Sequence, residues 1–337
     1  MQEYLQLFID PEYPYFIDKY LSTETLKRIL NVSQFCGCDY TNLYQILFLY
    51  TRFHHSLVVA HMTWHFTHDK KATIAALLHD IGTPCFAHCI DYVFGDYLKQ
   101  ESSERKITEM IKRDPTLLAY LQEDGITIDD LEQLEQYSIL ENQAPQLCTD
   151  RLDGVLHTCY IWLQTHSLQE IKEVYDNLTP LINEVGQIEL GFTDLGIAEK
   201  FVQMVAIYVQ ELQGNKDKYV MKYISEVVKE AFQRNLLILE DLYTKKEADI
   251  VSMFASSFIS WNEFQQATTI IQSTEKPEGF AISFATKKRN VIPLVSLAGT
   301  PAKRIVEISE YAKNIYTELD QISEPQYAYV KSITRIS

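Results

Sequence analysis

The stretch Leu77-Leu78-His79-Asp80-Ile81-Gly82-Thr83-Pro84 decides the fold, because it places a His-Asp doublet at the end of an apolar run. Residues 71–79 are rich in Ala, Leu and Ile on nearly every side, which predicts a helix inside the core. Adjacent side chains on a helix point about 100° apart. The doublet can therefore hold one ion only where the helix ends, and the glycine and proline that follow predict that end.

Two further stretches supply side chains that bind metals. His55 lies in Arg52-Phe53-His54-His55-Ser56-Leu57, and Asp150 lies in Thr149-Asp150-Arg151-Leu152-Asp153. With the doublet they give two imidazoles and two carboxylates, a set that suits one catalytic divalent ion of Mn, Fe, Co, Ni or Zn. The alternative is that both histidines are core residues with satisfied hydrogen bonds and that Asp150 caps a helix.

The order and spacing of these motifs resemble the HD-domain metal-dependent phosphohydrolases. Three motifs resemble the deoxynucleotide triphosphohydrolase branch of this superfamily. They are Arg-x-x-His-Ser-Leu-x-Val, Leu-Leu-His-Asp-Ile-Gly-x-Pro-x-Phe-x-His and Asp-Arg-Leu-Asp. Its ligand histidine stands directly before Ser-Leu, which favours His55 over His54. The resemblance covers less than half of the chain. It implies a helical bundle over roughly residues 22–165 and a metal held by His55, His79, Asp80 and Asp150.

The same resemblance implies roles for residues around the metal. His88 and Asp91 match a His-Asp pair near the scissile phosphate, with His88 as general acid or base and Asp91 orienting it. Arg52 matches an arginine that contacts phosphate, since a guanidinium grips phosphate at two points. Lys288 and Arg289 resemble a basic segment that reaches a phosphate. The alternatives are a surface His-Asp pair, a surface salt bridge and a solvated turn.

Three positions depart from the triphosphohydrolase pattern. Thr83 stands where these enzymes carry a histidine, Gln100 where they place a histidine before a glutamate, and Gly154 where they carry an aromatic residue that contacts the sugar. These departures leave a second interpretation open, a non-catalytic regulatory protein that senses nucleotide. A helical scaffold with a structural metal is a third, although structural zinc sites are usually closed, often by thiolates.

Helical spacing of apolar residues recurs along the rest of the chain, for example over residues 194–213 and 217–236. Residues 278–297 instead carry two apolar segments around a basic turn and predict a two-stranded β-hairpin. We therefore expect an all-α protein with an HD metal-binding domain over residues 1–185. A helical C-terminal region over residues 186–337 would carry the hairpin. The first 21 residues, rich in Tyr and Pro, predict an irregular entry segment.

Three histidines, His61, His65 and His68, recur at helical spacing and suggest a second metal site. No carboxylate partner is evident in the sequence, so a polar helix face is the stronger interpretation. The six cysteines are too few for a disulfide framework in 337 residues and lack paired CxxC spacing, which favours free thiols in a reducing compartment.

The net charge of −16 weighs against a nucleic-acid partner, which requires a basic surface. A small phosphorylated substrate is compatible with it, because a metal and a few local cations can hold phosphate, with Mg as an additional ion on the substrate. No apolar run reaches the roughly 20 residues that span a bilayer, and no signal peptide is visible. We therefore expect a cytoplasmic protein without membrane contact. The resemblance adds the expectation of a homo-oligomer.

Overall fold

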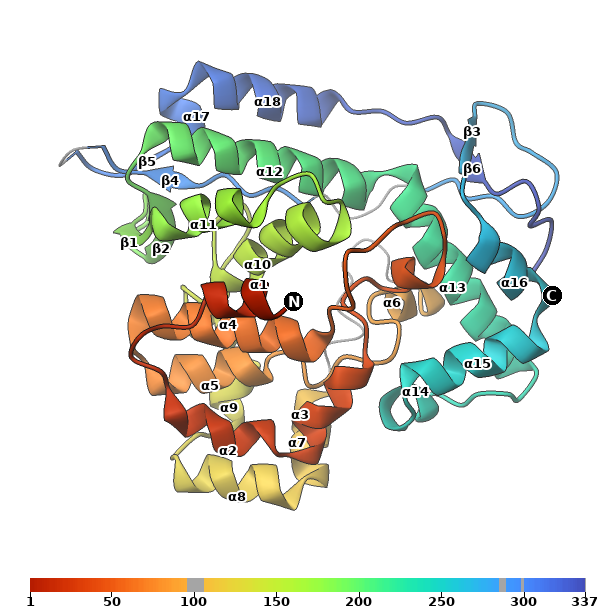
Figure 1. Ribbon diagram of the computed structural model, residues 1–337, viewed down its shortest axis with the longest axis horizontal. Coiled ribbons are helices and arrows are strands. Elements are labelled where there is room, and N and C mark those ends of the chain that lie inside the picture. Colours follow the sequence, from red (N-terminus) through yellow and green to blue (C-terminus); the bar gives the residue numbers. More distant parts are fainter. Residues whose placement is uncertain (96–105, 285–288, 298–299, 337) are drawn as a thin grey trace.

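Helices dominate the architecture, and two small sheets accompany the C-terminal half (Figure 1). The computed structural model describes residues 1–95, 106–284, 289–297 and 300–336. The expected fold class, a helical bundle with a small β element, is confirmed. In the described part of the chain, no helix combines the length and the apolar character needed to span a bilayer.

The N-terminal half is built from short and medium-length helices. They are α1 (Gln2–Leu7), α2 (Asp18–Leu21), α3 (Glu24–Arg28), α4 (Arg52–Thr67), α5 (Lys70–Leu78), α6 (Cys89–Val93), α7 (Ile107–Arg113), α8 (Pro115–Glu123), α9 (Ile128–Glu132), α10 (Thr149–His157) and α11 (Leu168–Asp176). Three of them, α4, α5 and α10, carry the His and Asp motifs. Asp69 caps α5 by accepting hydrogen bonds from the amides of Lys71 (2.8 Å) and Ala72 (3.1 Å). This cap fixes where the helix of the His-Asp doublet begins.

The C-terminal half is built around two long helices, α12 (Leu195–Gln213) and α13 (Asn215–Gln233), which the helical spacing of apolar residues predicts. The other helices there are α14 (Asp241–Thr244), α15 (Glu247–Ser257), α16 (Ile259–Gln266), α17 (Ile305–Ile308) and α18 (Glu310–Gln321). Figure 1 shows α18 running along α12, with the sheets at the two ends of this pair.

The larger sheet has the strand order β1-β2-β4-β5. Its strands are β1 (Leu178–Ile182), β2 (Ile188–Phe192), β4 (Leu294–Val295) and β5 (Lys303–Arg304). Strand β2 pairs antiparallel with β1 and parallel with β4. Gly191 lies at this junction, where a Cβ atom would approach the Leu294 carbonyl oxygen to 2.7 Å. Strands β3 (Ile271–Ser273) and β6 (Tyr327–Tyr329) pair antiparallel in a separate sheet.

The predicted hairpin over residues 278–297 is wrong. Ile282 instead exchanges two backbone hydrogen bonds with Ala328 (2.9 and 3.1 Å), and Leu294 lies in β4 beside β2. Ile282 and Leu294 are 2% and 1% exposed. Each apolar segment therefore buries its side chains against a distant strand, and this burial outweighs the short loop closure of a local hairpin. Lys288 lies outside the described residues.

The predicted division at residue 185 falls in the turn between β1 and β2 and stays a prediction. Buried residues from both sides of that turn belong to one hydrophobic core, including Leu152 and Val155 of α10 and Phe201 of α12.

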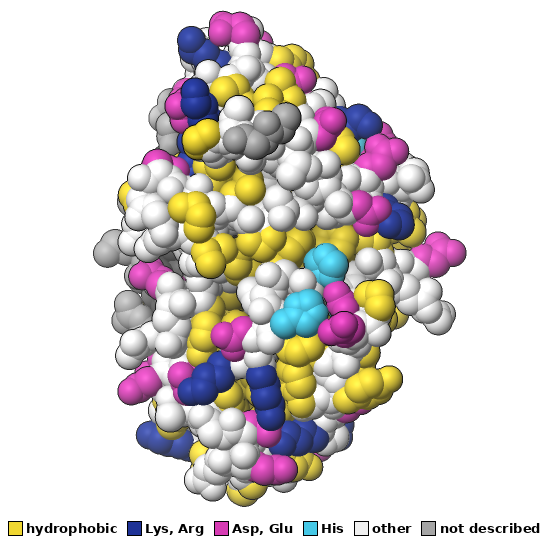
Figure 2. All heavy atoms as spheres, turned by 90° about the vertical axis from the view of Figure 1, so that its left-hand side faces the viewer, with side chains coloured by type: hydrophobic (Ala, Val, Ile, Leu, Met, Phe, Trp, Pro, Cys, Tyr) yellow, Lys and Arg dark blue, Asp and Glu magenta, His cyan; other side chains and the backbone are white. Residues whose placement is uncertain are grey.

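The face in Figure 2 carries basic, acidic and hydrophobic side chains in a mixed pattern, and histidines reach its surface beside acidic residues.

Candidate metal centre

The four predicted ligands come from three helices. His55 lies one turn into α4, and Asp150 lies in the first turn of α10. His79 is the C-cap residue of α5, and Asp80 follows it in the turn. The end of α5 thus lets both members of the doublet face α4 and α10, as the spacing argument requires. Arg28 supports this turn by donating to the carbonyl oxygens of Ile81 and Thr83.

These side chains converge on one buried point. The Nε2 atom of His55 lies 2.9 Å from Asp150 Oδ1 and 4.0 Å from Asp80 Oδ2. The Nε2 atom of His79 lies 3.6 Å from the same Asp150 oxygen and 3.7 Å from the same Asp80 oxygen. Both histidine side chains are at most 10% exposed. His55, His79 and Asp80 therefore form a group close enough to hold a metal ion, and Asp150, whose side chain is 32% exposed, contacts both histidines beside it. The alternative in which Asp150 serves only as a helix cap does not explain these contacts.

The environment of His79 fits a bound ion. Its Nδ1 atom donates to the Ala76 carbonyl oxygen (2.7 Å), which turns Nε2 toward the carboxylates. This buried Nε2 has no hydrogen-bond partner among the described residues, although unpaired buried polar atoms are rare. Burial lowers the pKa of His79, but the Asp80 and Asp150 charges outweigh burial and raise it. Two imidazoles and two carboxylates are together a suitable ligand set for a divalent ion.

The Asp80 carboxylate is held in its ionised form. Arg52 donates to its Oδ2 atom (2.9 Å), and Thr83 donates to its Oδ1 atom (2.9 Å). Burial raises the pKa of Asp80, but Arg52 and the two imidazoles more than offset it and bring the pKa well below its usual range. Thr83, which stands where the triphosphohydrolases have a histidine, therefore orients the Asp80 carboxylate here.

A third carboxylate, that of Asp153, orients the His55 ring from the side opposite Asp150. It is fully buried, and its Oδ2 atom accepts from His55 Nδ1 (2.6 Å), Tyr50 (3.0 Å) and His157 (3.3 Å). His55, Asp153 and His157 also lie close enough to form a metal group. However, the facing atoms of this group are already hydrogen-bonded to one another. A carboxylate that holds the far nitrogen of a ligand histidine is a common support for metal sites.

Asp153 is the last residue of the Asp-Arg-Leu-Asp motif, but no role was predicted for it from the sequence. Its spacing from Asp150 was the available signal, because residues three apart on a helix share a face. His54, the competitor of His55, instead accepts a hydrogen bond from the Thr51 amide (3.2 Å) at the start of α4. Burial lowers the pKa of His55, but its hydrogen bonds to Asp150 and Asp153 outweigh burial and raise the pKa to about 10.

The predicted His88–Asp91 pair is formed. His88 Nδ1 lies 2.9 Å from Asp91 Oδ2, and Asp91 is fully buried. The two residues before His88, Phe86 and Ala87, have left-handed φ values of 64° and 45°, a strained arrangement for side chains of this kind. Burial and the nearby Arg52 and Arg289 charges lower the pKa of His88 despite its bond to Asp91.

The predicted phosphate-binding residues lie in different surroundings. Arg52 is 7% exposed and engaged by Asp80. Arg289 donates a hydrogen bond to Tyr208 of α12, and its charge acts on His88. Tyr208 lies beside Gly154, where an added Cβ atom would lie 3.8 Å from the tyrosine ring. Lys288 and Gln100 lie outside the described residues, so their predicted places stay predictions.

The other candidate metal residues have separate partners. His65 Nδ1 bonds to Asp10 (2.5 Å), and His68 Nε2 lies 3.6 Å from Glu12. His61 is buried, with its ring 5.4 Å from that of Tyr13. In the described residues these three histidines do not form a metal group. All six cysteines are buried and free, as predicted.

Acid is expected to destabilise the fold through His61. Burial lowers the pKa of His61 from 6.5 to about 4. The unfolded chain therefore takes up this proton first, so stability that is complete above pH 6.5 is lost as the pH falls toward 4. The loss is on the order of 3 kcal/mol. His61→Phe, which keeps a ring against Tyr13, is expected to flatten the fall in unfolding free energy over this pH range in urea titrations. An unchanged pH dependence would contradict this.

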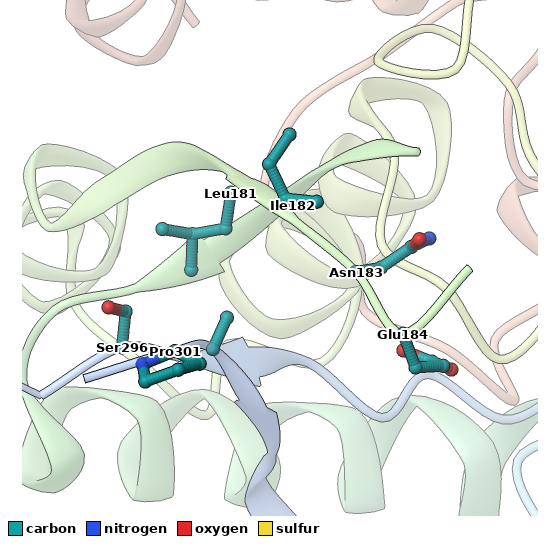
Figure 3. Close-up of a pocket in the computed structure, with 7 residues that line it drawn as sticks. Leu181, Ile182, Asn183, Glu184, Ser296 and Pro301 are labelled. Atoms are coloured by element: carbon teal, nitrogen blue, oxygen red, sulfur yellow. The ribbon is translucent and has the colours of Figure 1, made fainter. Parts of the chain in front are cut away.

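Two cavities lie away from the metal centre. The first, of about 450 Å³, lies between the β1–β2 hairpin and the segment around Pro301 (Figure 3). Glu184, its charged lining residue, pairs with Arg304 (2.9 Å). The second, of about 400 Å³, is bordered by Tyr92 of α6 and by Lys222 of α13. The predicted ligands do not line either cavity.

Comparisons with known proteins find sequence similarity at low identity. No family model matches the chain. The uncharacterized protein YdhJ of Bacillus subtilis is 22% identical over 208 residues, which are 61% of this chain and 62% of that protein. An uncharacterized protein of Mycoplasma genitalium is 24% identical over 197 residues, 52% of this chain and 45% of that protein. The chain thus spans less than two thirds of the length of these relatives.

Solved structures resemble the chain over almost its whole length. A hypothetical protein from Aquifex aeolicus superposes with a TM-score of 0.61 at 17% identity, covering 93% of this chain and 91% of its own. A phosphohydrolase from Bacteroides thetaiotaomicron superposes with a TM-score of 0.62 at 14% identity, covering 96% of both chains. The chain therefore shares its fold with a protein described as a phosphohydrolase.

Proposed function

We propose that this chain is an HD-type metal-dependent phosphohydrolase that cleaves a nucleotide, such as a deoxynucleoside triphosphate, or a related phosphoester. The observation that carries the proposal is the buried Nε2 atom of His79, which faces carboxylates and His55 but has no hydrogen-bond partner among the described residues. The set of His55, His79, Asp80 and Asp150 can hold one divalent ion and leave room for a substrate oxygen. The shared fold with a protein described as a phosphohydrolase supports the reaction class.

Each residue around the metal centre has a proposed role. A divalent ion bound there would lower the pKa of a water molecule and polarise a phosphoryl oxygen. His88 accepts or delivers a proton, and its lowered pKa keeps the imidazole neutral near pH 7. Asp91 fixes the orientation of that imidazole (2.9 Å). Arg52 and Arg289 supply positive charge toward the substrate phosphates, with Lys288 as a further candidate and Mg as an additional ion.

A nucleotide-binding sensor is the second candidate. The observation that favours it is the Thr83 hydroxyl, which donates to Asp80 (2.9 Å) where the triphosphohydrolases carry a proton-transfer histidine. In a sensor the centre would bind the nucleotide without cleaving it. The substrate, a homo-oligomeric state and a cytoplasmic location all stay proposals on either account.

A product assay separates the two candidates. The purified chain, loaded in turn with Mn²⁺, Co²⁺, Ni²⁺, Fe²⁺ or Zn²⁺, is incubated with deoxynucleotides, ribonucleotides and simple phosphoesters, and products are resolved by ion exchange. Metal-dependent product supports the hydrolase, and release of intact triphosphate identifies the triphosphohydrolase reaction. Orthophosphate or a monophosphate keeps the hydrolase and changes the substrate class. Nucleotide binding in a thermal-shift assay without any product overturns the proposal in favour of the sensor.

His88→Gln is expected to lower the turnover number by about 100-fold or more while leaving metal content unchanged. The reason is that proton transfer by a positioned side chain typically contributes about 10²- to 10⁴-fold, and His88 is not among the proposed ligands. Steady-state kinetics and elemental analysis of the same preparation measure both quantities. Turnover equal to that of the parent chain would remove His88 from the mechanism.

A further inference from the structure

The Asp153 carboxylate, which holds the Nδ1 atom of His55, also accepts a hydrogen bond from a residue near the N-terminus. Tyr4, in the N-terminal helix α1, donates its hydroxyl to Asp153 Oδ1 at 2.7 Å. The two residues are 149 positions apart, and both are fully buried. In Figure 1 α1 lies beside α10, and this hydrogen bond joins the two helices. The prediction of an irregular segment over the first 21 residues is therefore wrong where α1 forms, and this helix reaches the candidate metal centre.

The hydrogen bond of Tyr4 differs from the other bonds to Asp153. The carboxylate offers two oxygens with about four acceptor sites. His55, Tyr50 and His157 all bond to Oδ2. Among the described residues, Tyr4 is the partner of Oδ1. Rotation of the carboxyl group about its Cβ–Cγ bond is therefore restrained on one side by three donors and on the other side by Tyr4.

The orientation of Asp153 decides where His55 points. Its Oδ2 atom accepts a hydrogen bond from the N–H of His55 Nδ1, which favours the tautomer that presents the Nε2 lone pair to a metal. A carboxylate free to rotate would weaken that 2.6 Å bond and loosen the imidazole ring. The position of His55 Nε2 relative to Asp150 and Asp80 thus depends on a donor in α1.

The ring of Tyr4 is held by packing that does not involve its hydroxyl. It stacks on Tyr160 with centroids 5.6 Å apart and an interplanar angle of 13°. It also meets the edges of Phe8 (5.0 Å) and Tyr50 (5.8 Å). Removing the hydroxyl alone therefore leaves these aromatic contacts in place, which separates the role of the hydrogen bond from that of the ring.

We propose that Tyr4 is a positioning residue of the metal centre, acting on the ligand His55 through the Asp153 carboxylate. The proposal rests on the proposed function only for the identity of the metal ligands. It assigns a role in metal binding to the first helix of the chain, which is remote in sequence from all four ligands.

The test compares Tyr4→Phe with a matched control, Tyr160→Phe. The control removes the hydroxyl of the stacked partner, which does not bond to Asp153 in the described part of the chain. Each purified variant and the parent chain is titrated with Co²⁺, with affinity measured by calorimetry and ligand geometry by the visible absorption bands of the bound ion. Far-UV circular dichroism and thermal melting report the folded fraction in the same buffer.

Tyr4→Phe is expected to bind Co²⁺ about 10-fold more weakly, the low end of the roughly 10- to 100-fold losses seen for outer partners of metal ligands. Its absorption bands should shift, because the imidazole geometry changes, while Tyr160→Phe should match the parent chain. An unshifted spectrum with parental affinity in Tyr4→Phe would overturn the inference and leave the proposed function intact. Equal losses in both variants would also overturn it, since they indicate general destabilisation. Failure of the parent chain to bind Co²⁺ would instead overturn the metal centre itself.

Discussion

His79→Gln is expected to abolish metal retention and to lower phosphoester turnover by at least about 1,000-fold. The Nε2 atom of His79 is buried without a hydrogen-bond partner among the described residues, so its removal deletes a ligand without breaking a hydrogen bond at that atom. A metal that polarises a phosphoryl oxygen and activates water contributes several kcal/mol to the reaction, and each 1.36 kcal/mol corresponds to about tenfold in rate. Elemental analysis and initial-rate measurements on the same preparation check both effects.

His65→Gln is the matched control for this substitution. The His65 side chain is 42% exposed and bonds to Asp10 rather than to any proposed ligand. It should retain parental metal content and turnover. A His79→Gln variant that keeps one tightly bound metal per chain and full activity would show that the ion, if it drives the reaction, is held elsewhere.

Asp80→Asn is expected to eliminate turnover and also to destabilise the fold. The substitution removes a ligand and, at the same time, the counter-charge of Arg52, whose side chain is only 9% exposed. Leaving one partner of a buried ion pair uncompensated costs about 3 kcal/mol or more. Urea denaturation of the metal-free proteins should therefore show a lower unfolding free energy for the variant than for the parent chain.

A double variant separates the two effects of Asp80→Asn. Adding Arg52→Met removes the uncompensated charge and fills its space with an apolar side chain, a replacement that is often neutral or stabilising. The double variant should recover most of the unfolding free energy but should not retain metal. Recovery of metal retention together with stability would mean that Asp80 acts through the fold rather than as a ligand.

Features that depend on residues close together in the sequence were predicted correctly. The apolar run over residues 71–79 forms α5, and this helix ends at the His-Asp doublet, before the glycine that predicts its end. The His88–Asp91 pair forms because residues three apart meet on one turn. The preference for His55 over His54 came from the family resemblance, since both histidines lie in the same apolar stretch. The structure separates them, with His54 at the helix start and His55 facing Asp150.

Contacts between segments that are far apart in the sequence were not predicted correctly. The segments around Ile282 and Leu294 look like the two strands of a hairpin, but each pairs with a strand from a distant part of the chain. Tyr4 lies in a segment that the sequence predicts as irregular but that forms helix α1, and its bond to Asp153 depends on how α1 packs on α10. Local propensity carries no information about such packing.

The most direct test of the metal centre is anomalous diffraction from crystals of the chain soaked with Mn²⁺, recorded above and below the manganese absorption edge. The account predicts one strong peak per chain, bonded to Nε2 of His55 and of His79 and to carboxylate oxygens of Asp80 and Asp150. A fully occupied peak between Asp153 and His157, or crystals that bind no Mn²⁺ among the four predicted ligands, would contradict it.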